Sequence, residues 1–408
     1  MDIKLTIFVD SKFVSIMSTY VFLTFAVHGI GGTQIYVRNK LLFLQKRGWD
    51  VKVITSESGN NIMVRELAPF ANDIVPEIAK NPGLYSKNVR EAALMRMVDI
   101  VGASGDKVVI ESDFMAATLW GEMLAERLKA RHLVLLIQEN YSIDVPRYQR
   151  FWAWKFQRHE FAVNVQDGAR KLLHKYCNVP DEADAFLIPA CHNVIEEYDA
   201  TELDALVKKA DYHIGSVGRV NKPFVLPMVR SVQSFAEKHP DKCFQLVLFG
   251  GSPVSDDITD IYQYRRDNLQ IDITGALFPV PRHLIDRMDV FIASAGAART
   301  TYEAGAVTIA IDANDFEPIG IMGEAGCLDS VNRLPGQNCG SIGDLLERVL
   351  FTQHPYPKPG IVPYELDRIF QKHIDFLDKM VMAKEYYDIR KTWPSLMSRM
   401  KNHIKKYF

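Results

Sequence analysis

The sequence predicts an α/β protein made of two similar halves, each a doubly wound parallel sheet. Apolar strand-like runs alternate with helix-like stretches from residue 20 to 165, and the alternation starts again at residue 214. Because a parallel strand pair needs a crossover helix, such alternation favours parallel sheets. The length of 408 residues suits two domains of about 150–200 residues each. Ligands are expected between the halves, at the carboxyl ends of the strands.

The first half is expected to begin with a buried strand rather than a membrane segment. The apolar run 13–27 is about 15 residues long, shorter than the ~20 that a spanning helix needs, and it leads directly into Gly29. A helix follows at 33–47, where apolar residues recur at helical spacing before Gly48. The expected strands of this half are 20–27, 51–55, 107–111, 133–138 and 161–165.

The second half contains the most informative segment, residues 289–312. It reads as a strand at 290–293, a loop of small residues at 294–298, a short helix carrying Glu303, and a strand at 307–311. A loop almost without side chains leaves backbone N–H groups free at a helix N-terminus, which favours binding of an anion. The other expected elements are strands 214–217, 244–249 and 269–273 and helices 227–238 and 282–288.

The domain boundaries follow from this pattern and from a charged, weakly apolar stretch between the halves. We expect a first domain at 1–195, a linker at 196–211, a second domain at 212–375, and helices at 376–408 that return to the first domain.

The composition excludes several classes of function. Hydrophobic residues make up 48% and charged residues 24%, and 48 Lys and Arg against 50 Asp and Glu leave a net charge of −2. Without a bulk positive field, nucleic acid is not an expected partner. The five cysteines include no CxxC pair, so we expect neither a disulfide framework nor a zinc site, and a cytoplasmic location fits best.

Four short motifs carry the chemistry. GGTQIYVRNKLLFLQKRGWDVKVIT places two glycines after the first strand, and SVGRVNKPF places an Arg and a Lys after the strand at 214–217. LVLFGGSP ends a strand in two glycines, and TGALFP follows the next strand. Together with segment 289–312, these motifs resemble, in this order, the GT-B-fold glycosyltransferases of the large family-four kind.

The resemblance implies two Rossmann-like domains facing a cleft, and transfer of a sugar from a nucleoside-diphosphate sugar with retention of configuration. It implies a glycan or lipid-linked acceptor, such as a growing polysaccharide of the cell envelope, and no metal or other cofactor. Arg219 and Lys222 would pair with the donor diphosphate, and Glu303 would accept hydrogen bonds from the ribose. The backbone positions expected to line the donor are Gly31, Gly32, Gly250, Gly251, Ala276, Gly296 and Ala297.

Two positions depart from the family pattern. Ala295 stands eight residues before Glu303, where the family shows a first glutamate near the donor sugar, and the spacing from Arg219 to Lys222 is three where the family usually shows five. Arg299 lies on the same helix as Glu303, where an exposed helix arginine is the simpler interpretation. The Ala295 departure keeps open a non-catalytic relative that binds a nucleotide sugar or a partner enzyme. A sugar-nucleotide epimerase on the same fold is the other alternative.

The acceptor side is marked by carboxylates at strand ends. Glu139 follows the strand at 133–138 and is a candidate general base, with Glu111 and Asp113 at the end of another strand pointing toward the same cleft edge. Each of these two is alternatively a solvated strand-end carboxylate. His28, before the Gly-Gly turn, is a further candidate for a sugar or phosphate contact and alternatively a packed core residue.

The C-terminal stretch 391–408 mixes apolar and basic residues. It reads either as a helix that packs on the first domain or as a basic amphipathic helix that contacts an anionic membrane from the cytoplasmic side. The two interpretations are compatible.

Overall fold

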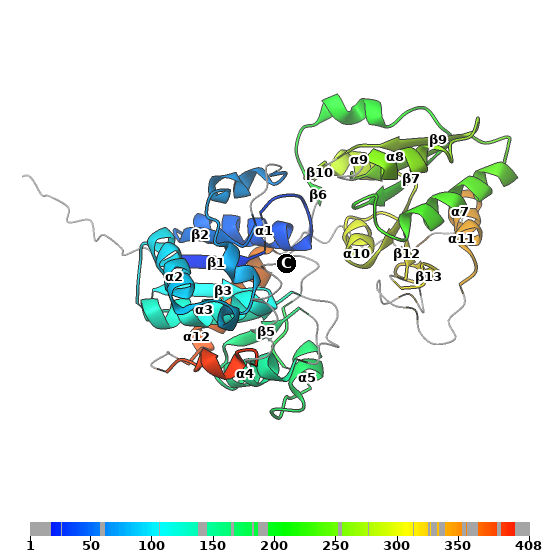
Figure 1. Cartoon of the computed structure of the whole chain (residues 1–408). Helices are drawn as coiled ribbons and strands as arrows, with labels where there is room; N and C mark the ends of the chain where they lie inside the picture. The colour runs from blue at the N-terminus through cyan, green and yellow to red at the C-terminus, as the bar shows by residue number, and fades with distance from the viewer. Residues whose placement is uncertain are drawn as a thin grey trace, which may run out of the picture.

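The structure is a computed structural model of the chain, and it forms two α/β domains that lie side by side (Figure 1). It describes residues 18–395 except for 26, 58–61, 106, 138–144, 165–166, 182, 187–194, 252–254, 276, 313, 325–326, 328–332, 334–338, 353–355, 357–365 and 382–384.

The described strands of the first domain form a five-stranded sheet in the order β2-β1-β3-β4-β5, with every pair parallel. Its strands are nearly continuous apolar runs because helices cover both faces of the sheet. The expected strands are confirmed, with ends that differ by a few residues. The strands are β1 (Thr19–Thr24), β2 (Asp50–Thr55), β3 (Val108–Ser112), β4 (Arg131–Leu136) and β5 (Phe161–Val163).

Two layers of helices cover this sheet. α1 (Gly32–Lys46) and α12 (Leu366–Lys379) pack on one face, and α2 (Lys87–Val101) and α3 (Met115–Leu128) pack on the other. The remaining helical segments are α4 (Pro146–Gln157), α5 (Gly168–Leu173), η1 (Arg65–Phe70), η2 (Pro76–Ala79), η3 (Pro82–Leu84) and η5 (Ile389–Thr392). Among the described residues, no helix has both the length and the apolar character needed to cross a bilayer.

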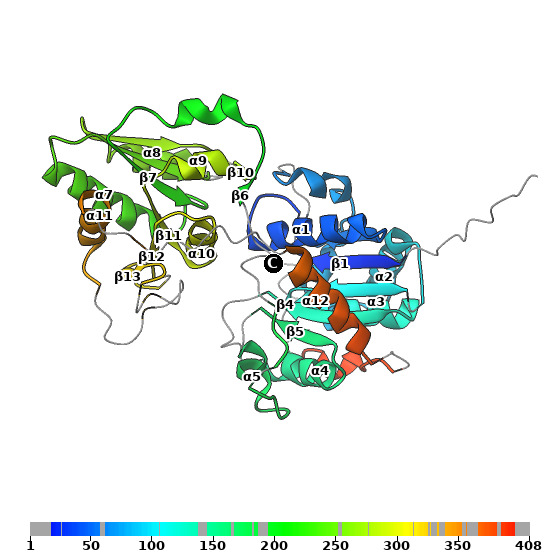
Figure 2. The ribbon, with the colours of Figure 1, turned by 180° about the vertical axis from the view of Figure 1, so that it is seen from behind.

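The chain returns to the first domain at α12, which begins before the expected domain boundary at residue 375. Seen from behind, α12 crosses the first sheet beside α1 (Figure 2). Ile369, Phe370, Phe376 and Leu377 belong to the same hydrophobic cluster as β1 and α1. The expected boundary at residue 375 therefore falls inside a helix whose apolar face belongs to the first domain. The amphipathic tail was expected at 391–408, and residues 396–408 of it lie outside the described residues.

The described strands of the second domain form a six-stranded sheet in the order β13-β12-β11-β7-β8-β9, in which only β13 runs antiparallel to its neighbour. β8 and β9 have the expected bounds, β7, β11 and β12 differ from the expected strands by one or two residues, and β13 was not expected. The strands are β7 (Tyr212–Val217), β8 (Phe244–Phe249), β9 (Leu269–Ile273), β11 (Val290–Ser294), β12 (Thr308–Ile311) and β13 (Pro318–Ile321).

Helices flank this sheet as well. α7 (Val225–Lys238) and α11 (Ile342–Phe351) pack on one face, and α9 (Arg282–Asp286) packs on the other. α11 begins with a capping box, in which Ser341 and Asp344 satisfy each other's backbone N–H groups. α8 (Ser255–Tyr262) and α10 (Ala295–Glu303) complete the set.

The expected linker is structured and belongs to the second domain. β6 (Ile195–Glu196) pairs with β10 (Val280–Pro281), and the short helix η4 (Thr201–Leu206) follows it. Ile195 and Val207 are buried in a cluster with second-domain residues. The segment that connects the two sheets therefore packs against the second domain.

Candidate functional site

The candidate site lies where the strand order of the second sheet changes direction. From β7 the chain proceeds outward through β8 and β9, and it then returns to the other side of β7 with β11. In an open parallel sheet such a switch point leaves a crevice at the carboxyl ends of the strands, because the two connections diverge there. The segments that follow β7, β8 and β11 meet in this crevice and enclose a cavity of about 400 Å³ together with the start of α1.

The cavity brings together most of the residues predicted to bind the donor. From the predicted set, its lining includes Gly31, Gly32, Arg219, Lys222, Gly250, Gly251, Gly296 and Ala297. Segments more than 200 residues apart in sequence thus form one site, and one of them comes from the first domain.

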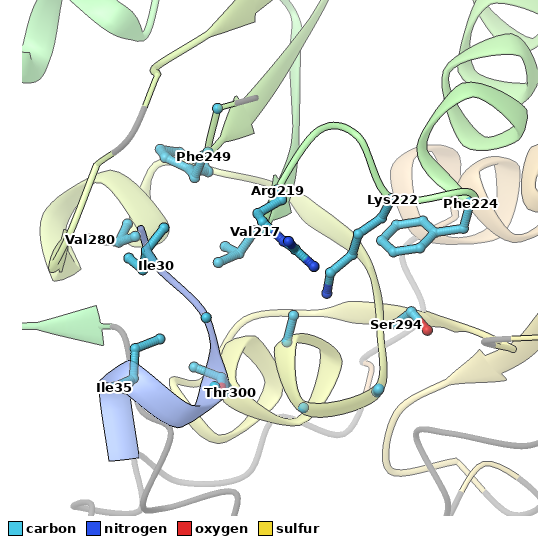
Figure 3. A pocket seen from close by; sticks show the side chains of 18 of the residues that line it. Ile30, Ile35, Val217, Arg219, Lys222, Phe224, Phe249, Val280, Ser294 and Thr300 are labelled. Atoms are coloured by element: carbon cyan, nitrogen blue, oxygen red, sulfur yellow. The ribbon is translucent and has the colours of Figure 1, made fainter. Parts of the chain in front are cut away.

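Arg219 and Lys222 supply positive charge to the cavity. Both side chains extend from the segment after β7 into the same space, above the start of α10 (Figure 3). Arg219 is exposed, and its guanidinium has no hydrogen-bond or ion-pair partner among the described residues. An arginine held without a protein partner in a cavity is available to pair with an anionic ligand.

The Gly-Gly turn after β8 supports the segment that carries Arg219. A Cβ on Gly250 would lie 1.8 Å from the carbonyl oxygen of Gly218 and 3.5 Å from the backbone nitrogen of Arg219. Only glycine allows these two strand ends to approach so closely. The glycine predicted to line the donor thus also has a packing role.

The small residues after β11 form the first turn of a helix rather than the expected loop. Ser294 is extended and is followed at once by α10, whose first residue, Ala295, has a φ of 52°. The left-handed residue turns the chain sharply, so the strand passes into the helix without a loop. The Ser294 side chain makes no capping hydrogen bond to α10. The N–H groups of its first turn are thus left for a ligand, and the helix dipole favours an anion there.

The first domain contributes a second helix N-terminus. α1 begins after Gly31 without a side-chain cap and without an acidic residue in its first turn. Gly31 is extended, so a side chain would be tolerated by its backbone, whereas Gly29, with a φ of 71°, is the residue of this turn that favours glycine. Two uncapped helix N-termini and two cationic side chains therefore border one cavity.

The rest of the cavity wall is mostly apolar, apart from Ser294 and Thr300, and its apolar residues were not singled out from the sequence. No Asp or Glu is found among its described lining residues. Apolar residues at strand and helix ends look like ordinary core positions in a sequence, so only the hollow between the domains distinguishes them. They include Ile30, Ile35, Phe249, Leu277, Val280 and Phe316.

One predicted donor residue whose position is described, Glu303, does not belong to this lining. Glu303 ends α10, half-buried and outside the residues that line the cavity, and burial raises the pKa of its carboxyl while Arg299 opposes the shift. Its contact with a ribose stays a prediction. Ala276 and Glu139 lie outside the described residues.

One of the acceptor-side carboxylates is a core residue, which corrects the expectation that it points to the cleft edge. Glu111 is 1% exposed, accepts from Tyr20 and Tyr36 at 2.6 and 2.7 Å, and forms an ion pair with Lys40 at 2.5 Å. Its side chain points from β3 into the layer beneath α1, where these three donors compensate for its burial.

Asp113 and His28 differ from Glu111. Asp113 follows β3, is 8% exposed, and accepts a hydrogen bond from the Thr24 hydroxyl at 2.7 Å. His28 is half-buried, with Nε2 3.7 Å from a carboxylate oxygen of Glu57 and with no partner for Nδ1 among the described residues. Neither residue lines the donor cavity.

Comparison with known proteins gives a match at the level of fold. No family model matches the sequence, and no curated protein matches it. A crystal structure of a mutant of S. aureus TarM with Fondaparinux, alpha-GlcNAc-glycerol and UDP aligns with a TM-score of 0.54 and 8% identity, over 89% of this chain and 100% of that one.

Two further structures are comparably similar. A glycosyltransferase from Rickettsia africae ESF-5 aligns with a TM-score of 0.53 and 13% identity, over 95% of this chain and 98% of the other. Another TarM structure aligns with a TM-score of 0.51 and 7% identity, over 95% and 98%. The chain therefore has the predicted architecture, two Rossmann-like domains facing a cleft in the GT-B arrangement.

Proposed function

We propose that the protein is a glycosyltransferase that moves a sugar from a nucleoside-diphosphate sugar to a hydroxyl of a polysaccharide or lipid-linked glycan. The observation that carries the proposal is the electropositive cavity between the domains. It combines two uncapped helix N-termini with Arg219 and Lys222, and its described lining holds no carboxylate. A diphosphate is the group that such a set of donors and positive charges fits.

The same groups account for the chemistry of the leaving group. When the bond between the anomeric carbon and the phosphate oxygen breaks, negative charge develops on the diphosphate. Arg219, Lys222 and the N–H groups at the start of α10 stabilise that charge without reorganisation, since they already point into the cavity. Closure of the domains around the apolar wall would exclude water from the bound donor.

Several finer features belong to the proposal. Retention of configuration and the contact of Glu303 with the ribose rest on the resemblance of the motifs. Because two side-chain cations match the charge of a diphosphate, we propose catalysis without a metal ion, so treatment with EDTA should leave the rate unchanged. A cytoplasmic location, with the C-terminal stretch touching a membrane that carries the acceptor, is likewise proposed.

The printed contents of one similar structure agree with this substrate class. The TarM mutant was crystallised with UDP and alpha-GlcNAc-glycerol. For the present chain, the base, the sugar and the acceptor are to be found by experiment.

The test is a binding panel of UDP, GDP, ADP, TDP and CMP, followed by thermal shift and calorimetry on two variants. Arg219→Ala removes the unpartnered cation in the cavity, and Lys238→Ala removes an exposed cation at the end of α7. The two variants change the net charge equally. We expect one diphosphate to bind, with Kd raised about 10- to 100-fold by Arg219→Ala, since hydrogen bonds to charged groups contribute about 1.5–3 kcal/mol.

The other outcomes separate the alternatives. Binding of no nucleotide would overturn the proposal. Binding without release of the diphosphate from any nucleotide sugar would indicate a non-catalytic relative, the alternative that Ala295 suggests because it replaces the family's first glutamate. Formation of an epimerised nucleotide sugar in the absence of any acceptor would indicate an epimerase, although that reaction calls for acid and base groups that the described lining lacks.

A further inference from the structure

Two cysteines of the second domain lie beside the same glycine of β13. Cys327 and Cys339 are twelve positions apart in the sequence, and both are present as thiols. A Cβ on Gly320 would lie 3.6 Å from the Sγ atom of each of them. The two sulfurs are therefore separated by at most twice that distance. Because glycine has no side chain, it leaves room for both thiols against the strand.

The two thiols are close enough to be joined, and they differ in access. A disulfide holds its sulfurs about 2 Å apart, and a change of rotamer moves a cysteine sulfur by about 3 Å. Rotamer changes of the two side chains can therefore close the largest gap that the shared contact with Gly320 allows. Cys327 is buried, whereas Cys339 is half-buried, so an oxidant in solution reaches Cys339 first.

The sulfur of Cys327 belongs to the layer beneath α10. Cys327 packs in a small apolar cluster with Ala298 of α10, and its Sγ lies 3.9 Å from Met322 Sδ. Ala297, which packs against the same cluster, lines the donor cavity. Protein interiors are close-packed, so a sulfur that leaves this layer changes the support of the first turns of α10.

The stretch between the two cysteines is tied to another part of the cavity wall. Arg333 donates its backbone N–H to Asp312 Oδ2 at 2.7 Å, and its guanidinium pairs with Asp315. The carbonyl oxygen of Asp312 accepts from the backbone N–H of Phe316 at 3.2 Å. Phe316 lines the cavity. A link between the cysteines would therefore act on the cavity through the turn 312–316 as well as through α10.

We propose that Cys327 and Cys339 are a redox-sensitive pair, that hydrogen peroxide converts them to a disulfide, and that this disulfide weakens binding of the donor. The effect on binding rests on the proposed function, whereas formation of the disulfide does not. A reversible disulfide of this kind is compatible with a reducing compartment, where paired thiols serve as redox sensors.

The chemistry consumes one molecule of peroxide for each disulfide. The Cys339 thiolate attacks one peroxide oxygen, the O–O bond breaks, and hydroxide leaves behind a sulfenic acid. The Cys327 thiolate then attacks the Cys339 sulfur, the S–S bond forms, and a second hydroxide leaves. The two thiol protons convert the two hydroxides to water. The thiols have lost two electrons, and the peroxide has gained them.

The first experiment detects the disulfide by mass spectrometry of the full chain. Trypsin cleaves after Arg333, so peptides 300–333 and 334–348 carry one cysteine each, Cys327 and Cys339. After treatment with hydrogen peroxide, alkylation with iodoacetamide and digestion without reductant, these two peptides should be found linked, with the loss of two hydrogens. Dithiothreitol should separate them. Peptides that carry Cys177 and Cys243 should remain unlinked and alkylated.

The second experiment measures, by calorimetry, the Kd of the diphosphate that binds in the panel described above. Oxidation should raise this Kd about tenfold, which corresponds to about 1.4 kcal/mol, and dithiothreitol should restore it. Cys327→Ala, which keeps the cluster apolar, and Cys339→Ser should each bind as the reduced wild type does before and after peroxide. Cys243→Ser removes an exposed cysteine and should respond to peroxide as the wild type does.

The outcomes separate this inference from the proposed function. Linked peptides that do not exceed those formed by Cys177 or Cys243 would overturn the pair as a redox site. A disulfide with an unchanged Kd, or a rise in Kd that Cys327→Ala and Cys339→Ser retain, would overturn its effect on the donor cavity. If no diphosphate binds, the proposed function and the effect on binding fail together, and the linked peptides still decide whether the disulfide forms.

Discussion

Replacement of Gly250 by alanine tests whether the packing of the strand ends holds Arg219 in the cavity. The added Cβ would lie 1.8 Å from the Gly218 carbonyl oxygen, whereas real Cβ contacts are essentially never shorter than 3.0 Å. The segment after β7 must therefore move by roughly an ångström. It is tied to its neighbours by hydrogen bonds from Gly218 N to Phe249 O at 3.0 Å and from Val220 N to Gly251 O at 3.2 Å.

The magnitude follows from overpacking. Such a clash costs about 1–3 kcal/mol, which for a domain of this size lowers Tm by about 2–12 °C. A shift of about 1 Å in a positioning group can also cost about 100-fold in rate. We therefore expect Gly250→Ala to lower Tm and to weaken binding of the diphosphate together.

Two other glycines separate stability from binding. Gly215→Ala, in the middle of β7, would place its Cβ 2.4 Å from the Phe291 ring, outside the cavity. It should lower Tm but leave the Kd unchanged in folded protein. Gly296→Ala meets nothing within 4 Å and lies in the first turn of α10. It should keep or raise Tm, since alanine is more stable than glycine in a helix by about 0.5–1 kcal/mol. It should weaken binding, because Gly296 lines the cavity and the added methyl group takes up space there.

Calorimetric titration measures the Kd of the diphosphate for the three variants, and thermal unfolding measures their Tm. Wild-type affinity in Gly296→Ala would refute the placement of the diphosphate against α10. Wild-type Tm and affinity in Gly250→Ala would refute the argument that close packing of the strand ends positions Arg219.

Two further predictions concern the domain interface and acid stability. Arg38 of α1 forms an ion pair with Glu196 of β6. Arg38→Ala should raise the Kd for the diphosphate about tenfold, because the second domain would hold α1 less firmly. Arg96→Ala, which breaks the exposed ion pair with Glu77, should leave the Kd unchanged. Burial lowers the pKa of His132 from 6.5 to about 4. As the pH falls, the unfolded state therefore binds the proton before the folded state does. The free energy of unfolding should be highest above pH 6.5 and should fall by on the order of 3 kcal/mol as the pH approaches 4. Urea unfolding at several pH values should show this loss, and His132→Gln should flatten the curve while the exposed His174→Gln does not.

Local patterns in the sequence were sufficient to predict most of the strands and their sequence along the chain. Apolar runs and glycine turns depend on neighbours a few residues away, so β8 and β9 coincide with their predicted ranges and β7 and β11 overlap theirs. The roles of the motif glycines and Arg219 were predicted from the resemblance of the motifs, and they follow strands whose carboxyl ends lie at the edge of the sheet where ligands bind.

The sequence did not predict the environment of the acidic residues. Glu111 and Asp113 are two positions apart and lie on or directly after the same strand, yet Glu111 pairs with Lys40 in the core and Asp113 lies past the end of β3, where it accepts a hydrogen bond from Thr24. Burial and partners depend on helices far away in sequence, which pack over one face of the sheet and not the other. The prediction for both residues was the same, and only one of them lies at the sheet edge.

By itself, the sequence determined that this protein has two parallel α/β domains and which strand ends carry glycines and cations. Only the tertiary structure decided that the start of α1 and the start of α10 face the same cavity, that much of its wall is apolar, and that α12 belongs to the first domain. The physical reason is the range of the interactions. Backbone conformation is set by adjacent residues, whereas a cavity is formed by surfaces that the chain brings together only after both sheets have been built.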